Sequence, residues 1–151
     1  MQRTTRASVR VDGEAVGRIE RGLVVFLGVG PGDSEATAQH LAGRIATLRV
    51  FADAAGRMNL DVGQSGGSVL LISQFTLYAD TSRGHRPSFI GAAPPPVASE
   101  LFNLFAYALR ERGLNVETGR FGTHMDVEMV NDGPVTLAVS SGERAWGTDA
   151  G

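Results

Sequence analysis

The sequence predicts a domain of the α/β class, of the α+β type, in which mostly antiparallel strands carry two helices on one side. Several short segments alternate apolar and polar residues with the period of a half-buried strand, as at Met125, Val127 and Met129. Two longer segments repeat their apolar residues at helical spacing. The chain has 151 residues, 42% of them apolar, which suits a single domain over residues 1–142 followed by a loosely ordered tail at 143–151.

The residue types that are missing exclude several kinds of chemistry. Cysteine and lysine are absent, which rules out disulfides, thiolate metal sites, a cysteine nucleophile, Schiff-base chemistry and a P-loop lysine. The 14 basic residues, all arginines, and the 16 acidic residues give a net charge of −2, so any RNA contact must be local. No apolar run approaches the ~20 residues that span a bilayer, and we expect a cytoplasmic protein.

The N-terminal segments predict strands joined by tight turns. Arg6 to Val11 and Glu14 to Glu20 flank Asp12-Gly13, a two-residue hairpin signal. The apolar run Leu23 to Val29 is short enough for a buried strand and is expected to extend the hairpin into a meander. The glycines of Gly28-Val29-Gly30-Pro31-Gly32 have the wrong spacing for a dinucleotide loop, so we interpret this segment as a turn into a helix.

Two amphipathic helices follow from the apolar spacing. The first is capped by Asp33 or Ser34, and the second is entered through Pro94-Pro95-Pro96 and stopped by Gly113. Each is expected to bury one apolar stripe on the sheet, which makes these residues core and not a cofactor site. The stripes are Ala38, Leu41, Ile45 and Leu48 in the first helix and Val97, Leu101, Leu104, Phe105 and Ala108 in the second.

A central strand is predicted over Ser68 to Leu77, because Val69 to Ile72 is apolar on both faces. Its C-terminal end carries Ser73-Gln74-Phe75-Thr76. The two hydroxyls are candidate nucleophiles or satisfy backbone groups, and the aromatic ring either packs in the core or stacks on a base. The long connection Asp80 to Pro96 is expected to face a substrate, since such loops are usually functional. Shorter extended segments are expected at Arg57 to Leu60 and Val116 to Gly122.

Near the C-terminus, Asn131-Asp132-Gly133-Pro134-Val135-Thr136 lies between two alternating segments and is predicted to be a hairpin tip. Asp-Gly favours a tight turn, but Pro134 removes a backbone donor where the returning strand should begin to pair. The segment is therefore either a plain surface turn with a trans proline or a special turn with a cis Gly133–Pro134 bond.

The common catalytic and metal-binding patterns are absent from the sequence. His40, His85 and His124 have none of the spacings of metal ligands, and no cofactor is expected. Ser73 and Thr76 have no histidine nearby in sequence, so a base for either hydroxyl would have to be His85 or His124 brought close by the fold.

The motifs Ser73-Gln74-Phe75-Thr76 and Asn131-x-Gly133-Pro134-x-Thr136 together closely resemble the pair that marks the D-aminoacyl-tRNA deacylases. The resemblance implies a three-layer β/β/α fold and hydrolysis of the ester joining a D-amino acid to the terminal adenosine of tRNA. It also implies some activity on glycyl-tRNA, including glycine mischarged on tRNA-Ala. The alternatives are a non-catalytic RNA-binding module and a structural dimer module. Further matching segments are Gln2-Arg3, Arg6-Ala7-Ser8-Val9, Met58-Asn59-Leu60, Gly66-Gly67-Ser68, Arg83-Gly84-x-Arg86-Pro87-Ser88-Phe89 and Thr118-Gly119-Arg120-Phe121.

The same resemblance assigns roles to single residues. Ser73, Gln74, Phe75 and Thr76 would line the pocket for the adenosine and the reacting carbonyl, with backbone N–H groups as an oxyanion site. Gly133 and Pro134 would form a cis motif that enters the other subunit's pocket in a homodimer, where its carbonyl oxygens hold the substrate amino group. We therefore predict a cis bond and a homodimer. The remaining substrate-binding residues would be Asn131, Val135, Thr136 and Arg3, which braces the motif.

One departure from the family pattern concerns the N-terminus. Family members carry several apolar residues before Gln2-Arg3, and this sequence begins almost at that point. Either the first strand is accordingly short, or the start codon has been assigned late.

Overall fold

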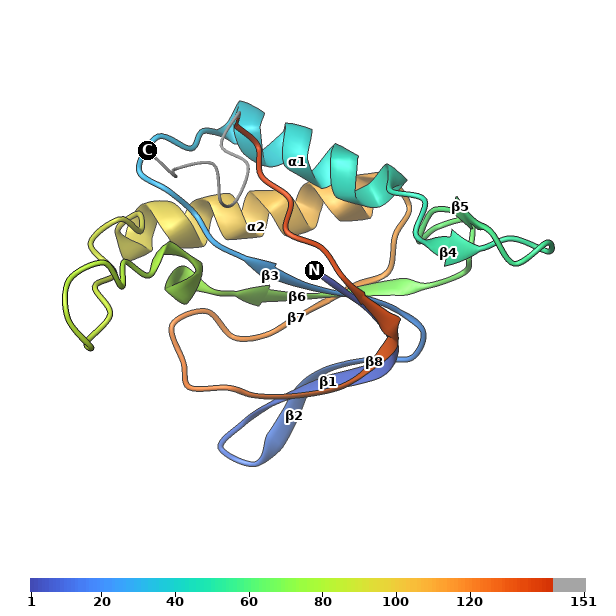
Figure 1. Cartoon of the computed structure of the whole chain (residues 1–151), viewed down its shortest axis with the longest axis horizontal. Coiled ribbons are helices and arrows are strands. Elements are labelled where there is room, and N and C mark those ends of the chain that lie inside the picture. Colours follow the sequence, from blue (N-terminus) through green and yellow to red (C-terminus); the bar gives the residue numbers. More distant parts are fainter. Residues whose placement is uncertain (143–151) are drawn as a thin grey trace.

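A computed structural model describes residues 1–142 of the chain, so the tail expected at 143–151 lies outside the described residues. The α+β class is confirmed: a mixed six-stranded sheet, a two-stranded sheet and two α-helices. Figure 1 shows both helices together on one side of the large sheet, as predicted. The elements are β1 (Gln2–Val11), β2 (Glu14–Ile19), β3 (Gly22–Leu27), α1 (Glu35–Thr47), β4 (Phe51–Ala52), β5 (Met58–Leu60), β6 (Ser68–Ser73), η1 (Phe75–Tyr78), α2 (Pro95–Glu111), β7 (Val116–Thr118) and β8 (Asp126–Thr136).

The three-layer β/β/α prediction implied two large sheets, but a single six-stranded sheet provides the β layers. Its order is β2-β1-β3-β6-β7, and β8 pairs with β1. The N-terminal part of β1 pairs with β3 and its C-terminal part with β2, both antiparallel, so β1 passes from one neighbour to the other as the sheet curves. The predicted hairpin at Asp12-Gly13 is confirmed, whereas the predicted meander is wrong, because β3 pairs with β1 and not with β2.

Most strand pairings are antiparallel, as predicted, because β1 pairs in this way with β2, β3 and β8, and the central strands make the sheet mixed. β3 and β6 are parallel, and so are β6 and β7. Parallel strands are usually buried on both faces, and the apolar residues of β6 are at most 1% exposed, which confirms the predicted central strand. On one face, Leu23 and Leu71 join the core beneath the helices, and on the other, Val24 and Leu70 join a second core against β1 and β2. The curved sheet therefore encloses one core and supports another.

The helices begin and end close to the predicted positions. Ser34 is the N-cap of α1, and its hydroxyl and that of Thr37 form a capping box with the two backbone N–H groups. α2 begins at Pro95, and its buried stripe contains Leu101 and Phe105 as predicted, but Val97 is 41% exposed and was wrongly assigned to the core. No helix within residues 1–142 has the length and hydropathy needed to cross a membrane.

The first strand is not short. β1 has ten residues, starts at Gln2 and is held at its beginning by Met1, whose amino group donates to the Leu137 carbonyl at 2.7 Å. The backbone of Leu137 returns a hydrogen bond to the Met1 carbonyl at 2.9 Å. The N-terminus is thus tied to the segment that follows β8.

Candidate functional site

The first candidate motif lies at the C-terminal end of two parallel strands. Ser73 is the last residue of β6 and pairs with Leu27, the last residue of β3. The backbone N–H of Gln74 donates to the Leu27 carbonyl at 2.8 Å, after which the chain turns into η1. The strand predicted to reach Leu77 therefore ends at Ser73. This turn leaves Phe75 and Thr76 exposed at the end of the sheet.

The glycines after β3 accommodate a tyrosine from η1. A Cβ atom on Gly30 would lie 2.7 Å from the Tyr78 hydroxyl oxygen, and one on Gly28 would lie 3.0 Å from the same ring. Glycine is needed at both positions because the ring packs directly on the backbone. This supports the interpretation of the glycine-rich segment as a turn and not a phosphate loop. Burial, and to a lesser extent the charge of Asp33, raises the pKa of Tyr78.

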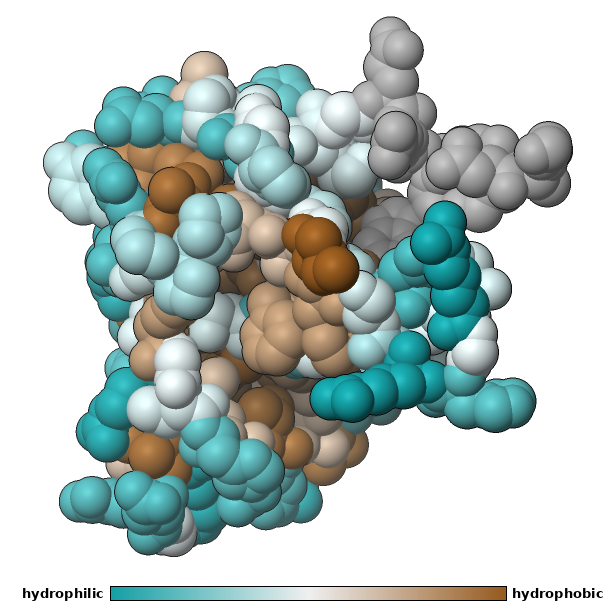
Figure 2. Space-filling view, turned by 90° about the vertical axis from the view of Figure 1, so that its left-hand side faces the viewer, coloured by the Kyte–Doolittle hydropathy of each residue, from teal (hydrophilic) through white to brown (hydrophobic). Residues whose placement is uncertain are grey.

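The ring of Phe75 is 59% exposed, which excludes core packing, the first of the two alternatives for this residue. Its edge-to-face partner is Phe89, with centroids 5.1 Å apart and planes at 81°. Phe89 comes from the long connection that was expected to face a substrate. Exposed apolar side chains at this end also include Leu77 and Ile90. Figure 2 faces this end of the molecule and shows apolar surface gathered at its centre, with polar residues around it.

In the part of the chain that the structure describes, neither hydroxyl of the motif has a catalytic base. Thr76 Oγ1 accepts a hydrogen bond from the side-chain amide of Gln74. Within residues 1–142 no histidine bonds to Ser73 or Thr76, and His124 instead lies 3.5 Å from the Asp126 carboxylate on the surface. The same described residues contain no cluster of three or more groups that could hold a metal ion.

The second motif lies within a single strand, and the predicted hairpin is wrong. β8 pairs with β1 on both sides of the motif, with Asn131 opposite Thr4 and Thr136 opposite Gln2. The four residues between Asn131 and Thr136 face only one residue of β1, so the backbone leaves the sheet and rejoins it. We call residues 132–135 the excursion. Its Gly133–Pro134 peptide bond is cis, as predicted, and both residues are exposed.

Polar side chains hold the excursion at its base. The Asn131 amide donates to Thr136 Oγ1 at 3.0 Å, and its oxygen accepts the backbone N–H of Val135 at 3.3 Å. The side chain of Val135 packs against the core beneath the helices, which makes it an anchor for the returning backbone. These contacts fix both ends of the excursion.

Arg3 braces the excursion from the side. Its Nε lies 3.1 Å from the Asp132 carboxylate, while Nη1 donates to the Val50 carbonyl at 2.6 Å. The Nε–H has no acceptor of hydrogen-bond geometry, so the contact with Asp132 is an ion pair. A Cβ atom on Gly133 would lie 3.0 Å from Arg3 Nη2, so the guanidinium also rests against the glycine.

The structure does not bring the two motifs together within one chain. The excursion begins beside Thr4, which pairs with Gly22 at the start of β3, whereas Ser73 pairs with Leu27 at its end. Five residues of strand separate these positions, which is about 16 Å. In Figure 1 the green turn after β6 lies at the left, whereas the β8 label lies right of the centre. Phe75 and Thr76 of the first motif and Gly133 and Pro134 of the second are exposed, and the two motifs do not meet within one chain.

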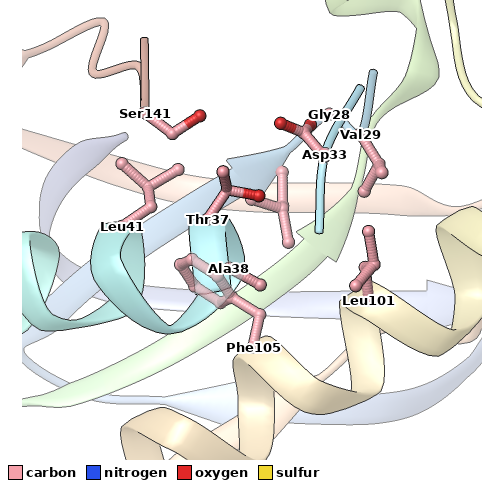
Figure 3. Close-up of a pocket in the computed structure, with 10 residues that line it drawn as sticks. Gly28, Val29, Asp33, Thr37, Ala38, Leu41, Leu101, Phe105 and Ser141 are labelled. Carbon is pink, nitrogen blue, oxygen red and sulfur yellow. The ribbon is translucent and has the colours of Figure 1, made fainter. Parts of the chain in front are cut away.

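A small pocket beside the helices does not have room for an aminoacyl nucleoside. It lies between α1, α2 and the end of β3, with Asp33, Thr37 and Ser141 at its polar side (Figure 3). Its volume of about 20 Å³ holds at most one water molecule. A wider groove of about 280 Å³ lies on the outer face of β1, β2 and β8, but neither motif lines it.

Sequence reasoning missed three residues that build the first motif's surroundings. Tyr78 and Phe89 hold η1 in place, and Asp80 closes the loop before Phe89. Phe89 ends a polar loop and belongs to a segment that matches the family, but neither signal placed it against Phe75.

Comparison with known proteins gives consistent results over nearly the whole chain. A family model described as D-Tyr-tRNA(Tyr) deacylase matches residues 1–140. A D-aminoacyl-tRNA deacylase of Deinococcus radiodurans is 57% identical over 139 residues, covering 92% of this chain and 96% of that protein. One of Symbiobacterium thermophilum is 55% identical over 141 residues, covering 93% of each chain.

Solved structures agree with the fold. The c-Myc DNA Unwinding Element Binding Protein superposes with a TM-score of 0.84 at 38% identity, covering 90% of this chain and 93% of that one. A probable eukaryotic D-amino acid tRNA deacylase gives a TM-score of 0.75 at 16% identity, covering 88% and 92% of the two chains, and supports the fold alone.

Proposed function

We propose a mechanism for this chain on the premise that it belongs to the D-aminoacyl-tRNA deacylase family, since the family model and relatives above 50% identity cover over 90% of it. The chain is a hydrolase that cleaves the ester between a D-amino acid and tRNA. The observation that carries the proposed mechanism is the Ser73-Gln74-Phe75-Thr76 segment with its exposed Phe75 and Thr76, which offers a ring and backbone donors but, among residues 1–142, no base. Residues 1–142 would form the complete catalytic domain.

Phe75 and the start of η1 would receive the terminal adenosine. The exposed face of the Phe75 ring suits stacking on the adenine, because its edge-to-face contact with Phe89 leaves that face open. The first N–H groups of a 3-10 helix have no partner within the helix, so those of Phe75 and Thr76 would stabilise the oxyanion. The two hydroxyls and the Gln74 amide would line the ribose and the ester.

The reaction would need no protein nucleophile. Water attacks the ester carbonyl carbon, the bond to the 3′-oxygen breaks, and that oxygen leaves with a proton originally on the water. The vicinal 2′-hydroxyl of the adenosine lies beside the ester in every aminoacyl-tRNA and would orient the water and relay this proton. The protein contributes the orientation and the backbone donors.

The excursion of a second copy would complete the pocket. Gly133 and Pro134 of the excursion are exposed, and Arg3 braces it. Within one chain the excursion lies near the start of β3 and the first motif at its end, so the excursion would serve the first motif of the other copy. A two-fold dimer would place two excursions in two pockets by one symmetric interface. The carbonyl oxygens at Gly133-Pro134 would bind the substrate amino group, and the same backbone would exclude an L side chain. Asn131 and Thr136 would maintain its shape.

The test of the function is incubation with matched D- and L-tyrosyl-tRNA, reading release of each amino acid. Release of D-tyrosine alone is expected, and glycyl-tRNA, which has no side chain to exclude, should react at high enzyme concentration. Rapid cleavage of the L substrate would contradict selection by the backbone.

The shared site has its own test. Gly133→Val should disable the excursion. Phe75→Ala should remove the adenosine platform, which is the Phe75 ring on which the adenine would stack. Each variant alone should be nearly inactive. If a pocket takes its two parts from two copies, mixing and refolding the variants should restore about a quarter of wild-type activity, because half the dimers regain one of two sites. No recovery, or a monomer in sedimentation with full activity, would exclude the shared site.

A further inference from the structure

The loop that follows η1 is a closed and positively charged projection beside Phe75. Asp80 and Ser88 exchange both backbone hydrogen bonds, at 2.7 and 2.9 Å, so residues 81–87 leave and return at one point. We call residues 81–87 the arginine loop. It reaches its tip at Gly84, whose φ of +76° suits glycine, and Arg83 and His85 flank that tip.

The charge of the loop is unbalanced. Arg83 and Arg86 are exposed, and neither makes a hydrogen bond or ion pair within residues 1–142. The segment from Thr81 to Ser99 contains no acidic residue, although the whole chain has a net charge of −2. Asp80 accepts the backbone N–H of Ser82 at 2.9 Å. Hydrogen bonds from Ser82, and to a lesser extent the charge of Arg83, lower the pKa of Asp80, so one carboxylate at the loop base faces two arginines. The loop keeps an excess of positive charge, and its exposed guanidinium groups can bind an anion.

The loop is also fixed relative to the adenosine platform. Phe89 follows Ser88 directly and packs edge to face on Phe75. A loop of seven residues that returns to its base extends by about three residues, or roughly 10 Å, before its side chains add their own length. With the adenine stacked on Phe75, this reach is long enough to meet phosphates of the nucleotides that precede the adenosine.

We propose that the arginine loop binds the phosphates of the unpaired 3′ end of the substrate tRNA through Arg83 and Arg86. The proposal rests on the proposed function and adds an RNA-binding surface to the same site. Guanidinium groups form bidentate hydrogen bonds with phosphate, and a local pair of them supplies affinity where the whole surface is not basic. The loop acts on RNA binding and not on the chemical step.

The experiment compares two substrates that share the ester and differ in phosphates. D-tyrosyl-tRNA carries the complete 3′ end, whereas D-tyrosyl-adenosine has no phosphate. For Arg83→Gln/Arg86→Gln, kcat/KM on the tRNA should fall about tenfold, mainly through KM, while the rate on the nucleoside ester is retained. The slope of log kcat/KM against log salt should become shallower by about 1.4, because each single-strand phosphate that an arginine neutralises contributes about 0.7.

A control with the same change of charge separates a local from a general effect. Arg10→Gln/Arg18→Gln removes two exposed arginines from the outer face of β1 and β2, away from both motifs. It should leave both substrates and the salt slope unchanged. An equal loss on tRNA in this control, an equal loss on both substrates in the loop variant, or no loss on either would overturn the proposal.

A direct measurement of tRNA binding tests the arginine loop separately from catalysis. Uncharged tRNA, followed by fluorescence anisotropy, should bind the loop variant about tenfold more weakly than wild type and the control. If the wild type hydrolyses neither D ester, the proposed function fails, and this binding result still decides whether the loop binds RNA. Equal tRNA affinity in all three proteins would refute the loop proposal alone.

Discussion

The two motifs differ in what holds them in place. Ser73-Gln74-Phe75-Thr76 is positioned by the main chain, through the pairing of Ser73 with Leu27 and the hydrogen bond from the Gln74 N–H to the Leu27 carbonyl, at the end of two buried strands. The excursion is positioned by side chains, chiefly Asn131 and Arg3. Side-chain substitutions should therefore disturb the excursion more than the first motif, whose chemical contribution comes from its backbone.

The largest effect should come from changing the RNA and not the protein. If the first motif supplies only backbone donors and a platform, the substrate's 2′-hydroxyl must perform the proton relay. A tRNA ending in 2′-deoxyadenosine, with the D-amino acid on its 3′-oxygen, should be hydrolysed about a thousandfold more slowly by the wild-type protein. Single-turnover rates measure this loss, and binding of the deoxy substrate by competition is the control. Cleavage of the deoxy substrate at the normal rate would show that the 2′-hydroxyl does not relay the proton.

The second largest effect should follow from Gly133→Ala. The φ of Gly133 is +118°, which an L side chain rarely adopts, and the added Cβ would lie 3.0 Å from both Arg3 Nη2 and Val135 Cγ2. Activity on D-tyrosyl-tRNA should fall about a hundredfold, while the free energy of unfolding should decrease by only about 1–3 kcal/mol. Gly142→Ala, where a Cβ meets nothing within 4 Å, is the matched control. Full activity of the Gly133 variant would show that the excursion is not in the pocket.

The same contrast explains what could be predicted from the sequence. The helices, the Asp12-Gly13 hairpin and the central strand follow from local patterns and caps. The predicted stripes share Ile45, Leu101 and Phe105 with the buried faces of the helices, but Val97 is exposed. The excursion was mistaken for a hairpin because alternation on both sides of a turn fits two strands as well as one interrupted strand. Only the pairing of Gln2 with Thr136 decides between them, and it joins opposite ends of the chain.

The end of β6 shows the other limit. Phe75 and Leu77 continue the apolar pattern of the strand, so the sequence predicted strand where the chain turns into η1. The turn is fixed by Tyr78 packing on Gly28 and Gly30, a tertiary contact that periodicity does not reveal. The two motifs are separated by about 16 Å of strand in one chain, so local patterns could not place them in one site. Roles for their single residues therefore came from the family resemblance.

A smaller effect is expected where one side chain ties the excursion. Asn131→Ala removes the bonds to Thr136 and to the Val135 backbone, and kcat should fall about tenfold. Asn131→Asp keeps an acceptor for the Val135 N–H but cannot donate to Thr136, so its loss should be intermediate. The ratio of D to L cleavage should decline in the same order. Equal losses in both variants, with selectivity intact, would mean that Asn131 contributes stability only.

The smallest effect should be that of Thr76→Ala at the first motif. The hydroxyl accepts a hydrogen bond from the Gln74 amide and has no base within residues 1–142, so its removal frees one exposed amide that water can satisfy. The backbone N–H of residue 76 is unchanged by the substitution, and the rate on D-tyrosyl-tRNA should fall only two- to fivefold, that is by about 1 kcal/mol or less.

Thr76→Ser, which restores an acceptor, should recover most of that loss, and Ser73→Ala should be similarly mild. Either of two results would contradict the proposed difference between the two motifs. If Thr76→Ala abolished hydrolysis while the 2′-deoxy substrate was cleaved normally, or if an acyl-enzyme on Ser73 or Thr76 could be trapped by acid quench and mass spectrometry, the protein would supply the nucleophile. The first motif would then depend on a side chain after all, as the excursion does.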